Sequence, residues 1–223
     1  MARPVGVRNP DFEKKKSDLI DKLTSFVLSD GVALPSMRQL AIAADTSQPT
    51  LNHYFSDRDG VIIAVIERLR IMSEPLRRQL RYAERTVEES IAGFIKIVKD
   101  LSGNDTYLRS HSFSIREGMV NPAVLKAYIE QLVDPAIDAI AERIVKTPGG
   151  SKNFATARVA ARALYDAANS IAMRTALAGM RPDADEFERQ LALMENWFLH
   201  GFLDYPDGPV LSTASDGREA RPR

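Results

Sequence analysis

Few side chains in this sequence have the types and spacing that catalysis needs. The 223 residues contain no cysteine, which excludes a disulfide framework, a thiolate zinc site and a cysteine nucleophile. The three histidines, His53, His111 and His200, form no pair at metal-ligand spacing. Neither a phosphate-binding glycine loop nor a nucleophile-elbow serine is present. We therefore expect no metal site, no cofactor and no enzymatic activity.

One dense polar group keeps a helical enzyme as an alternative hypothesis. Arg109, His111, Arg116 and Glu117 are close in sequence, and they are the one set from which acid–base chemistry could be built. The simpler interpretation is that these groups satisfy one another inside or beside a pocket. Turnover of a small molecule would distinguish the two interpretations.

Polar side chains of another kind lie in the segment between Leu34 and Val61. Gln48 and Asn52 carry amides that can pair with adenine, and Thr50 can donate, accept or contact a thymine methyl group. The residue before them, Ser47, and the backbone N–H groups of a helix start can bind a phosphate. The segment therefore predicts a helix that reads DNA, with a surface for docking another protein as the alternative.

Two short helices separated by a tight turn must position these side chains. Ser36 and Ser47 can each cap a helix, and the second of these is Gln48–Tyr54 with Pro49 in its first turn. A longer amphipathic helix, about Phe12–Ser29, precedes them. Together these elements form a helix-turn-helix arrangement.

The rest of the chain is predicted to be helical as well, giving an all-α fold of about nine helices. Ser73-Glu74-Pro75 and Pro135 are expected to break or kink helices. Two long helices should close the fold, one at about Asn153–Met180 and one beginning at Asp183. Residues 205–223, rich in Pro, Gly, Ser and charge, are expected to form a disordered tail.

Charge and hydropathy limit the cellular setting. The net charge is zero, and residues 1–60 carry eight Lys/Arg against eight Asp/Glu, so the DNA hypothesis depends on the motif. The N-terminus has no apolar signal-peptide core, and the longest apolar run, Val61–Ile66, is far short of the roughly 20 residues of a membrane span. We expect a cytoplasmic protein without a membrane partner.

The segment Leu34–Val61 resembles the TetR family of transcriptional regulators. Gln48-Pro49-Thr50-Leu51 is especially similar to the tetracycline-repressor branch. Asp45 departs from the family pattern by replacing the turn glycine, although Asp accepts left-handed geometry better than most residues. The positions that match the family's helices, turn and following basic residue are Leu40, Ala41, Ala44, Ser47, Leu51, Tyr54, Phe55 and Arg58.

This resemblance implies a homodimeric regulator with two domains. Residues 1–56 would be the helix-turn-helix DNA-binding domain, and residues 57–204 the helical effector-binding and dimerisation domain. The protein would bind a palindromic operator as a repressor, and a small-molecule effector would release it. The last two helices would form the dimer interface through Ala160, Ala161, Ala163, Ala167, Ala168, Ala172, Leu191, Met194, Trp197, Phe198 and Leu199.

Two sets of site residues are predicted. Bases would be read by Gln48, Thr50 and Asn52, while phosphates would be held by Arg38, Ser47, His53, Tyr54 and Arg58. The effector pocket would mix apolar and polar groups, as ligand sites do. Its predicted members are Phe94, Tyr107, His111, Phe113, Met119, Tyr128, Tyr165, Asn169 and Met173.

Overall fold

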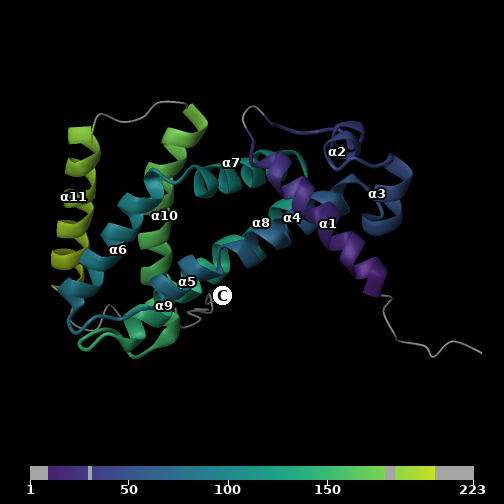
Figure 1. Ribbon diagram of the computed structural model, residues 1–223. Helices are drawn as coiled ribbons and strands as arrows, with labels where there is room; N and C mark the ends of the chain where they lie inside the picture. Colours follow the sequence, from purple (N-terminus) through teal and green to yellow (C-terminus); the bar gives the residue numbers. More distant parts are fainter. Residues whose placement is uncertain (1–9, 30–31, 179–183, 204–223) are drawn as a thin grey trace, which may run out of the picture.

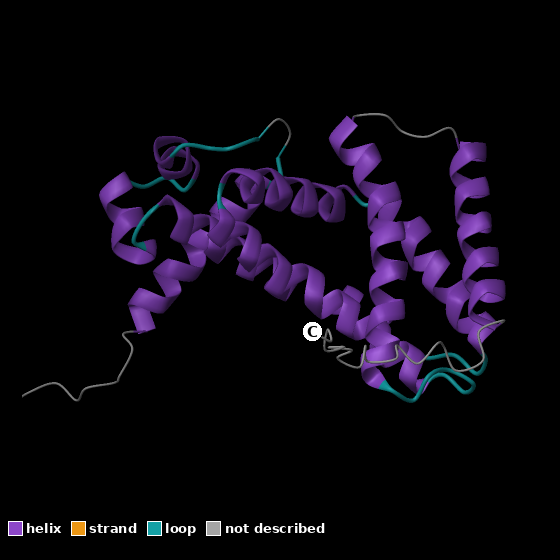
Figure 2. Ribbon diagram, turned by 180° about the vertical axis from the view of Figure 1, so that it is seen from behind, coloured by secondary structure: helices purple, strands orange, loops and turns teal. Residues whose placement is uncertain are grey.

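The computed structural model describes residues 10–29, 32–178 and 184–203, and this part of the chain is helical without any strand. The prediction of an all-α fold is therefore confirmed. The predicted tail, residues 205–223, and Asp183 lie outside the described residues. Figure 1 shows a small group of helices at one end of the molecule and a larger helical body at the other, and Figure 2 shows the same from behind.

The smaller group consists of four helices that enclose one core. They are α1 (Pro10–Val27), α2 (Met37–Ala43), α3 (Gln48–Phe55) and α4 (Arg58–Met72). Leu23, Leu40, Leu51, Ile62 and Ile66 are fully buried among them. We call α1–α3 the head, because α4 continues from it into the rest of the chain (Figure 1).

The larger body begins after a break at Ser73. Ser73 ends α4 and precedes a short helix, as the sequence around Pro75 predicts. The further helices are α5 (Glu74–Leu80), α6 (Val87–Ser102), α7 (Asp105–Val120), α8 (Pro122–Tyr128), a π-helix (Ile129–Val133), α9 (Asp134–Lys146), α10 (Phe154–Ala178) and α11 (Ala184–Leu203). The π-turn directly before Pro135 is a local widening of the kind that absorbs a helix irregularity.

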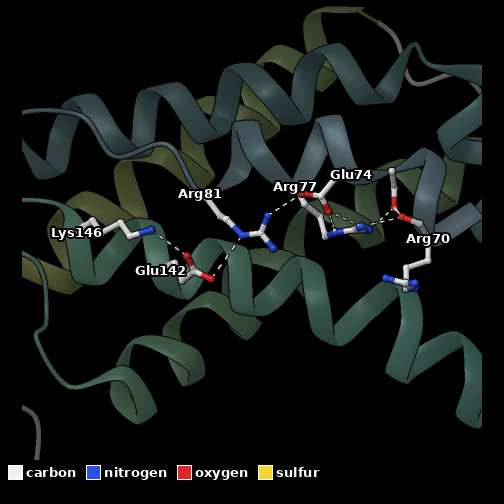
Figure 3. Close-up of polar contacts among 7 residues, drawn as sticks. Arg70, Glu74, Arg77, Arg81, Glu142 and Lys146 are labelled. Carbon is white, nitrogen blue, oxygen red and sulfur yellow. Dashed lines mark hydrogen bonds and ion pairs between the residues drawn. The ribbon is translucent and has the colours of Figure 1, made fainter.

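Charged side chains fix the break between α4 and α5 in place. The buried Arg77 donates to the carbonyl oxygen of Arg70 at 2.8 Å and to the Glu74 carboxylate at 2.7 Å. Arg81 then joins Glu74 to Glu142 on α9, as the dashed contacts in Figure 3 show. The carbonyl oxygen of Arg70 loses its helical partner at the break, and it accepts a hydrogen bond from Arg77 instead.

The alanine-rich face of α10 packs within the chain. Ala157 and Ala161 are fully buried, and they belong to the same core as Ile137 and Ile140 of α9. Small residues allow this close approach of α9 and α10. Ala161, Ala168, Leu191, Met194 and Phe198, which we predicted to form a dimer interface, are buried in this intrachain core.

No helix within the described residues is long and apolar enough to cross a lipid bilayer.

Candidate nucleic-acid interface and ligand pocket

The turn between α2 and α3 is built as the sequence predicts. Ser36 caps α2 in a reciprocal capping box with Gln39, and Ser47 caps α3 by accepting from the backbone N–H of Thr50. Asp45 has a φ of 52°, so it adopts the left-handed conformation that the turn requires. These local bonds set the angle between the two short helices.

Helix α3 divides into a buried face and an exposed polar face. Leu51 and Phe55 anchor it in the head core, while Gln48, Asn52 and His53 point to solvent. The side chains on the polar face can therefore reach a DNA groove without any change in the packing of the head.

Several side chains of the predicted DNA-binding set, Ser47, Thr50, His53 and Tyr54, have partners within the head. The Thr50 hydroxyl lies 2.8 Å from that of Ser47, and Thr50 is half-buried. The ring of Tyr54 packs on Phe12 at 4.6 Å between centroids and is also half-buried. Arg38 is exposed on α2 and has no such restraint.

A close approach joins α3 to α4. Ser56, the residue after α3, has a φ of 73°, and a Cβ atom at Gly60 would lie only 1.9 Å from the carbonyl oxygen of Phe55. Glycine is therefore required at position 60 for α4 to begin so near the end of α3. Asp57 caps α4, because its carboxylate accepts from the backbone N–H of Gly60.

Arg58, which we predicted to contact a DNA phosphate, also binds groups within the chain. Its guanidinium donates to both carboxylate oxygens of Glu117 at 2.8 and 2.9 Å, and its Nε donates to the carbonyl oxygen of Pro35 at 2.7 Å. Glu117 is fully buried, whereas 27% of the Arg58 side chain remains exposed. Burial raises the pKa of the Glu117 carboxyl, although the bonds to Arg58 act in the opposite direction. Arg58 thus joins the start of α4 to α7, and its contact with a DNA phosphate stays a prediction.

Further polar contacts join α7 and α8 to the head. Asn121 caps α8 and also donates to the Asp59 carboxylate at 2.5 Å. Arg109 donates to the carbonyl oxygen of Leu28, just beyond α1, at 3.1 Å. Helix α7 and the start of α8 therefore hold the start of α4 at two places and the segment after α1 at one.

A cavity of about 350 Å³ lies in the larger body, between α4, α5, α6, α7, α9 and α10. This volume is at the lower end of the range for small-molecule sites. The lining is mostly apolar, with a few hydroxyl, amide and imidazole groups. It consists of Leu69, Met72, Ser73, Leu76, Arg77, Leu80, Phe94, Ile97, Val98, Leu101, Asn104, Thr106, Tyr107, Ser110, His111, Leu132, Ala136, Ile140, Tyr165, Ala168 and Asn169.

Solved structures with this arrangement of helices are similar to the chain over most of its length. A TetR-family transcriptional regulator from Streptomyces coelicolor has 20% identity and a TM-score of 0.60, with 88% of this chain and 92% of that chain covered. GusR from Salmonella enterica has 17% identity and a TM-score of 0.60, covering 87% and 98%. EbrR, a multidrug binding protein in complex with imidazole, has 14% identity and a TM-score of 0.58, covering 81% and 94%. The chain has the fold of the TetR-family transcriptional regulators. No family model and no curated protein matches the sequence.

The cavity of this TetR fold contains some of the predicted effector residues and omits others. Phe94, Tyr107, His111, Tyr165 and Asn169 line it. Phe113 and Tyr128 instead belong to the core that the head shares with α4, and Met173 packs near Leu108. Met119 is 80% exposed at the end of α7, so its assignment to the pocket was wrong.

The sequence analysis did not predict the cavity-lining residues that α4 and α5 contribute. Leu69, Met72, Ser73, Leu76 and Arg77 come from the two sides of the break at Ser73. The signal was the Ser73-Glu74-Pro75 break itself, because two helix ends that diverge leave space that a continuous helix would fill.

The residues proposed for acid–base chemistry do not form one site in the TetR fold. His111 bonds through Nδ1 to the Tyr128 hydroxyl at 2.9 Å, while Glu117 binds Arg58 and Arg109 reaches the carbonyl of Leu28. Their side chains lie in different surroundings along α7. This arrangement gives the enzyme hypothesis no support.

Proposed function

We propose that this protein is a DNA-binding transcriptional regulator that acts as a homodimeric repressor on a palindromic operator. The observation that carries the proposal is the exposed polar face of α3, Gln48, Asn52 and His53, on a helix-turn-helix within a TetR fold. Side chains of these types can hydrogen-bond base edges in a major groove. We also propose the division into residues 1–56, which bind DNA, and 57–204, which sense and dimerise.

Substitutions on α3 test the DNA contact directly. Gln48→Ala and Asn52→Ala should each weaken operator binding by about 1–3 kcal/mol and relax the preference for one base pair per half-site. The operator is first selected from a random duplex pool, and affinity is then measured by fluorescence anisotropy at fixed salt. Lys96→Ala, on the exposed face of α6, is the matched control. Unchanged affinity and base preference in both α3 variants would show that another surface binds DNA.

Exposed apolar side chains on the last two helices support a dimer. Trp197 is 66% exposed and Leu193 68% exposed on α11, one turn apart, and Val159 is exposed on α10. A second copy of the chain would remove these groups from water, and large aromatic residues are common anchors of such interfaces. The proposed interface therefore keeps Trp197 of the residues first predicted and adds Leu193 and Val159.

Polar substitutions at Leu193 and Trp197 should separate the subunits. The double variant Leu193→Asp, Trp197→Ser should raise the dimer dissociation constant by about 30-fold or more, because truncating an interface anchor costs at least about 2 kcal/mol. Sedimentation velocity at several protein concentrations measures this constant. Tyr82→Asp, which changes an exposed aromatic residue after α5, is the control. A wild-type protein that is monomeric at micromolar concentration would contradict the proposal.

We propose that α7 transmits effector binding to the head. Tyr107, Ser110 and His111 on this helix line the cavity, while Arg109 and Glu117 on the same helix contact the head side. A ligand can change DNA affinity only through a difference in its affinity for the two head positions. The chemical screen for this step measures operator affinity in the presence of a metabolite library.

A further inference from the structure

The cavity is lined mainly by hydrocarbon. Leu69, Leu76, Phe94, Ile140 and Ala168 come from five different helices and contribute no polar side chain. A ligand buried among them gains stability from the apolar surface that it loses to the protein. The main body of the ligand is therefore apolar.

The lining offers no free charge to an ionic ligand. It contains no Asp, Glu or Lys side chain. Its one guanidinium, on Arg77, is paired with the Glu74 carboxylate. It also donates hydrogen bonds to the Ser73 hydroxyl and to the carbonyl oxygen of Arg70. Burial lowers the pKa of His111 to about 4, so this imidazole is neutral near neutral pH. An ion would lose its hydration in this cavity without gaining a partner of opposite charge.

Two side chains that can donate a hydrogen bond lie on one side of the cavity. The buried Tyr165 hydroxyl has no hydrogen bond of acceptable geometry, although the hydroxyl of Tyr128 is close enough to affect its pKa. Burial raises the pKa of Tyr165, which keeps the phenol protonated and able to donate. Asn169 accepts from the Tyr107 hydroxyl at 3.4 Å through Oδ1, which leaves its Nδ2 group as a second donor. Tyr165 and Asn169 are one turn apart on α10, so they share a helix face.

We propose that the cavity binds an uncharged, largely apolar molecule that carries one hydrogen-bond-accepting oxygen, a carbonyl or a hydroxyl, placed against Tyr165 and Asn169. The oxygen accepts a hydrogen bond from the buried Tyr165 hydroxyl, which makes none of good geometry with the described residues. The proposal rests on the proposed function, because it names the class of effector for the same sensor.

Four compounds with one aromatic skeleton test the ligand class. They are acetylnaphthalene with a carbonyl, ethylnaphthalene without oxygen, naphthoate as the anion and naphthylethylammonium as the cation. Binding to the full-length protein is measured at neutral pH by calorimetry and by the shift of the unfolding temperature. We expect acetylnaphthalene to bind at least about tenfold more tightly than ethylnaphthalene, because only acetylnaphthalene can accept the hydrogen bond. The two ions should bind more weakly than either neutral compound.

Substitutions of nearly unchanged shape test the proposed donors. Tyr165→Phe should remove most of the tenfold preference for acetylnaphthalene and leave binding of ethylnaphthalene unchanged or slightly stronger. Asn169→Leu should reduce the same preference. Tyr82→Phe removes an exposed hydroxyl and should have no effect. Because ethylnaphthalene binding reports the integrity of the cavity, a variant that fails to fold is recognised by the loss of both ligands.

The outcomes separate the ligand class from the proposed function. Tighter binding of either ion, equal binding of the ketone and the hydrocarbon, or no binding of all four would overturn the ligand class. Binding in the expected order without any effect on operator affinity would leave the ligand class standing and contradict the effector function. Failure of the ligand-free protein to bind any duplex would contradict the α3 proposal and leave the ligand class standing.

Discussion

Replacing Arg58 by alanine should lower the free energy of unfolding by about 3–5 kcal/mol at neutral pH. The variant leaves the Glu117 carboxylate fully buried without the guanidinium that now binds both of its oxygens. Loss of this partner should raise the pKa of Glu117 further, since Arg58 lowers it in the native protein. A raised pKa in the folded state means that protonation relieves the penalty, so the variant should recover part of its stability as the pH falls toward about 5. Urea denaturation at several pH values measures both effects.

Two control variants separate this explanation from simple loss of a charge. Arg68→Ala breaks the half-exposed ion pair with Asp21 and should cost less than about 1 kcal/mol. The double variant Arg58→Met, Glu117→Leu removes both charges and should restore most of the stability, because an apolar pair avoids the desolvation cost. A double variant as unstable as Arg58→Ala would contradict the buried-charge explanation.

The same Arg58 variant tests whether this residue also contacts DNA. A phosphate contact would contribute about one to the slope of log affinity against log salt. In the structure the guanidinium binds Glu117 and Pro35 instead, so Arg58→Ala should weaken operator binding with an unchanged slope. A slope that falls by about one would place Arg58 among the phosphate contacts.

The head was predictable because its determinants are local. Ser36 and Ser47 cap helices that begin one residue later, and Asp57 caps α4 in the same way. Each cap depends on a side chain and a backbone group within three residues, so the sequence displays the complete interaction. The left-handed turn at Asp45 is likewise a property of a short segment.

The contacts between the head and the larger body were not predictable, because their partners are distant in sequence. Arg58 and Glu117 are 59 positions apart, and Asn121 meets Asp59 across 62 positions. A basic residue after a helix-turn-helix has the same appearance whether it faces DNA or an acid from another helix. The same limit applies to α10, whose alanines fit an intersubunit seam and an intrachain core equally well.

The ligand pocket was predicted in part for a related reason. Residue type identified aromatic and polar candidates such as Tyr107, His111 and Tyr165, and helix geometry decides which of them face one cavity. Phe113 has the same apolar character as Phe94, yet it points into the core at the head. Only the packing of α7 between that core and the cavity distinguishes the two phenylalanines.

Acid should destabilise the protein through His111. This imidazole is buried, and desolvation lowers its pKa from 6.5 to about 4. Above about pH 6.5 the side chain is neutral in both the folded and the unfolded states, so it adds no pH dependence. Between about pH 6.5 and 4 the unfolded chain binds a proton that the folded state does not bind, and stability falls. Below about pH 4 both states are protonated, and the loss levels off at about 3 kcal/mol.

The difference between the wild type and His111→Gln isolates this loss, because all other titrations are common to the two proteins. Glutamine is neutral and can still bond the Tyr128 hydroxyl, so the wild type should lose about 3 kcal/mol more than the variant between about pH 7 and 4 in urea denaturation. His53→Gln, which removes an exposed imidazole, controls for the loss of a histidine as such. Equal acid dependence of the wild type and His111→Gln would show that the imidazole becomes charged within the fold. An acidic ligand would then have a cationic partner in the cavity, which would remove the basis for an uncharged effector.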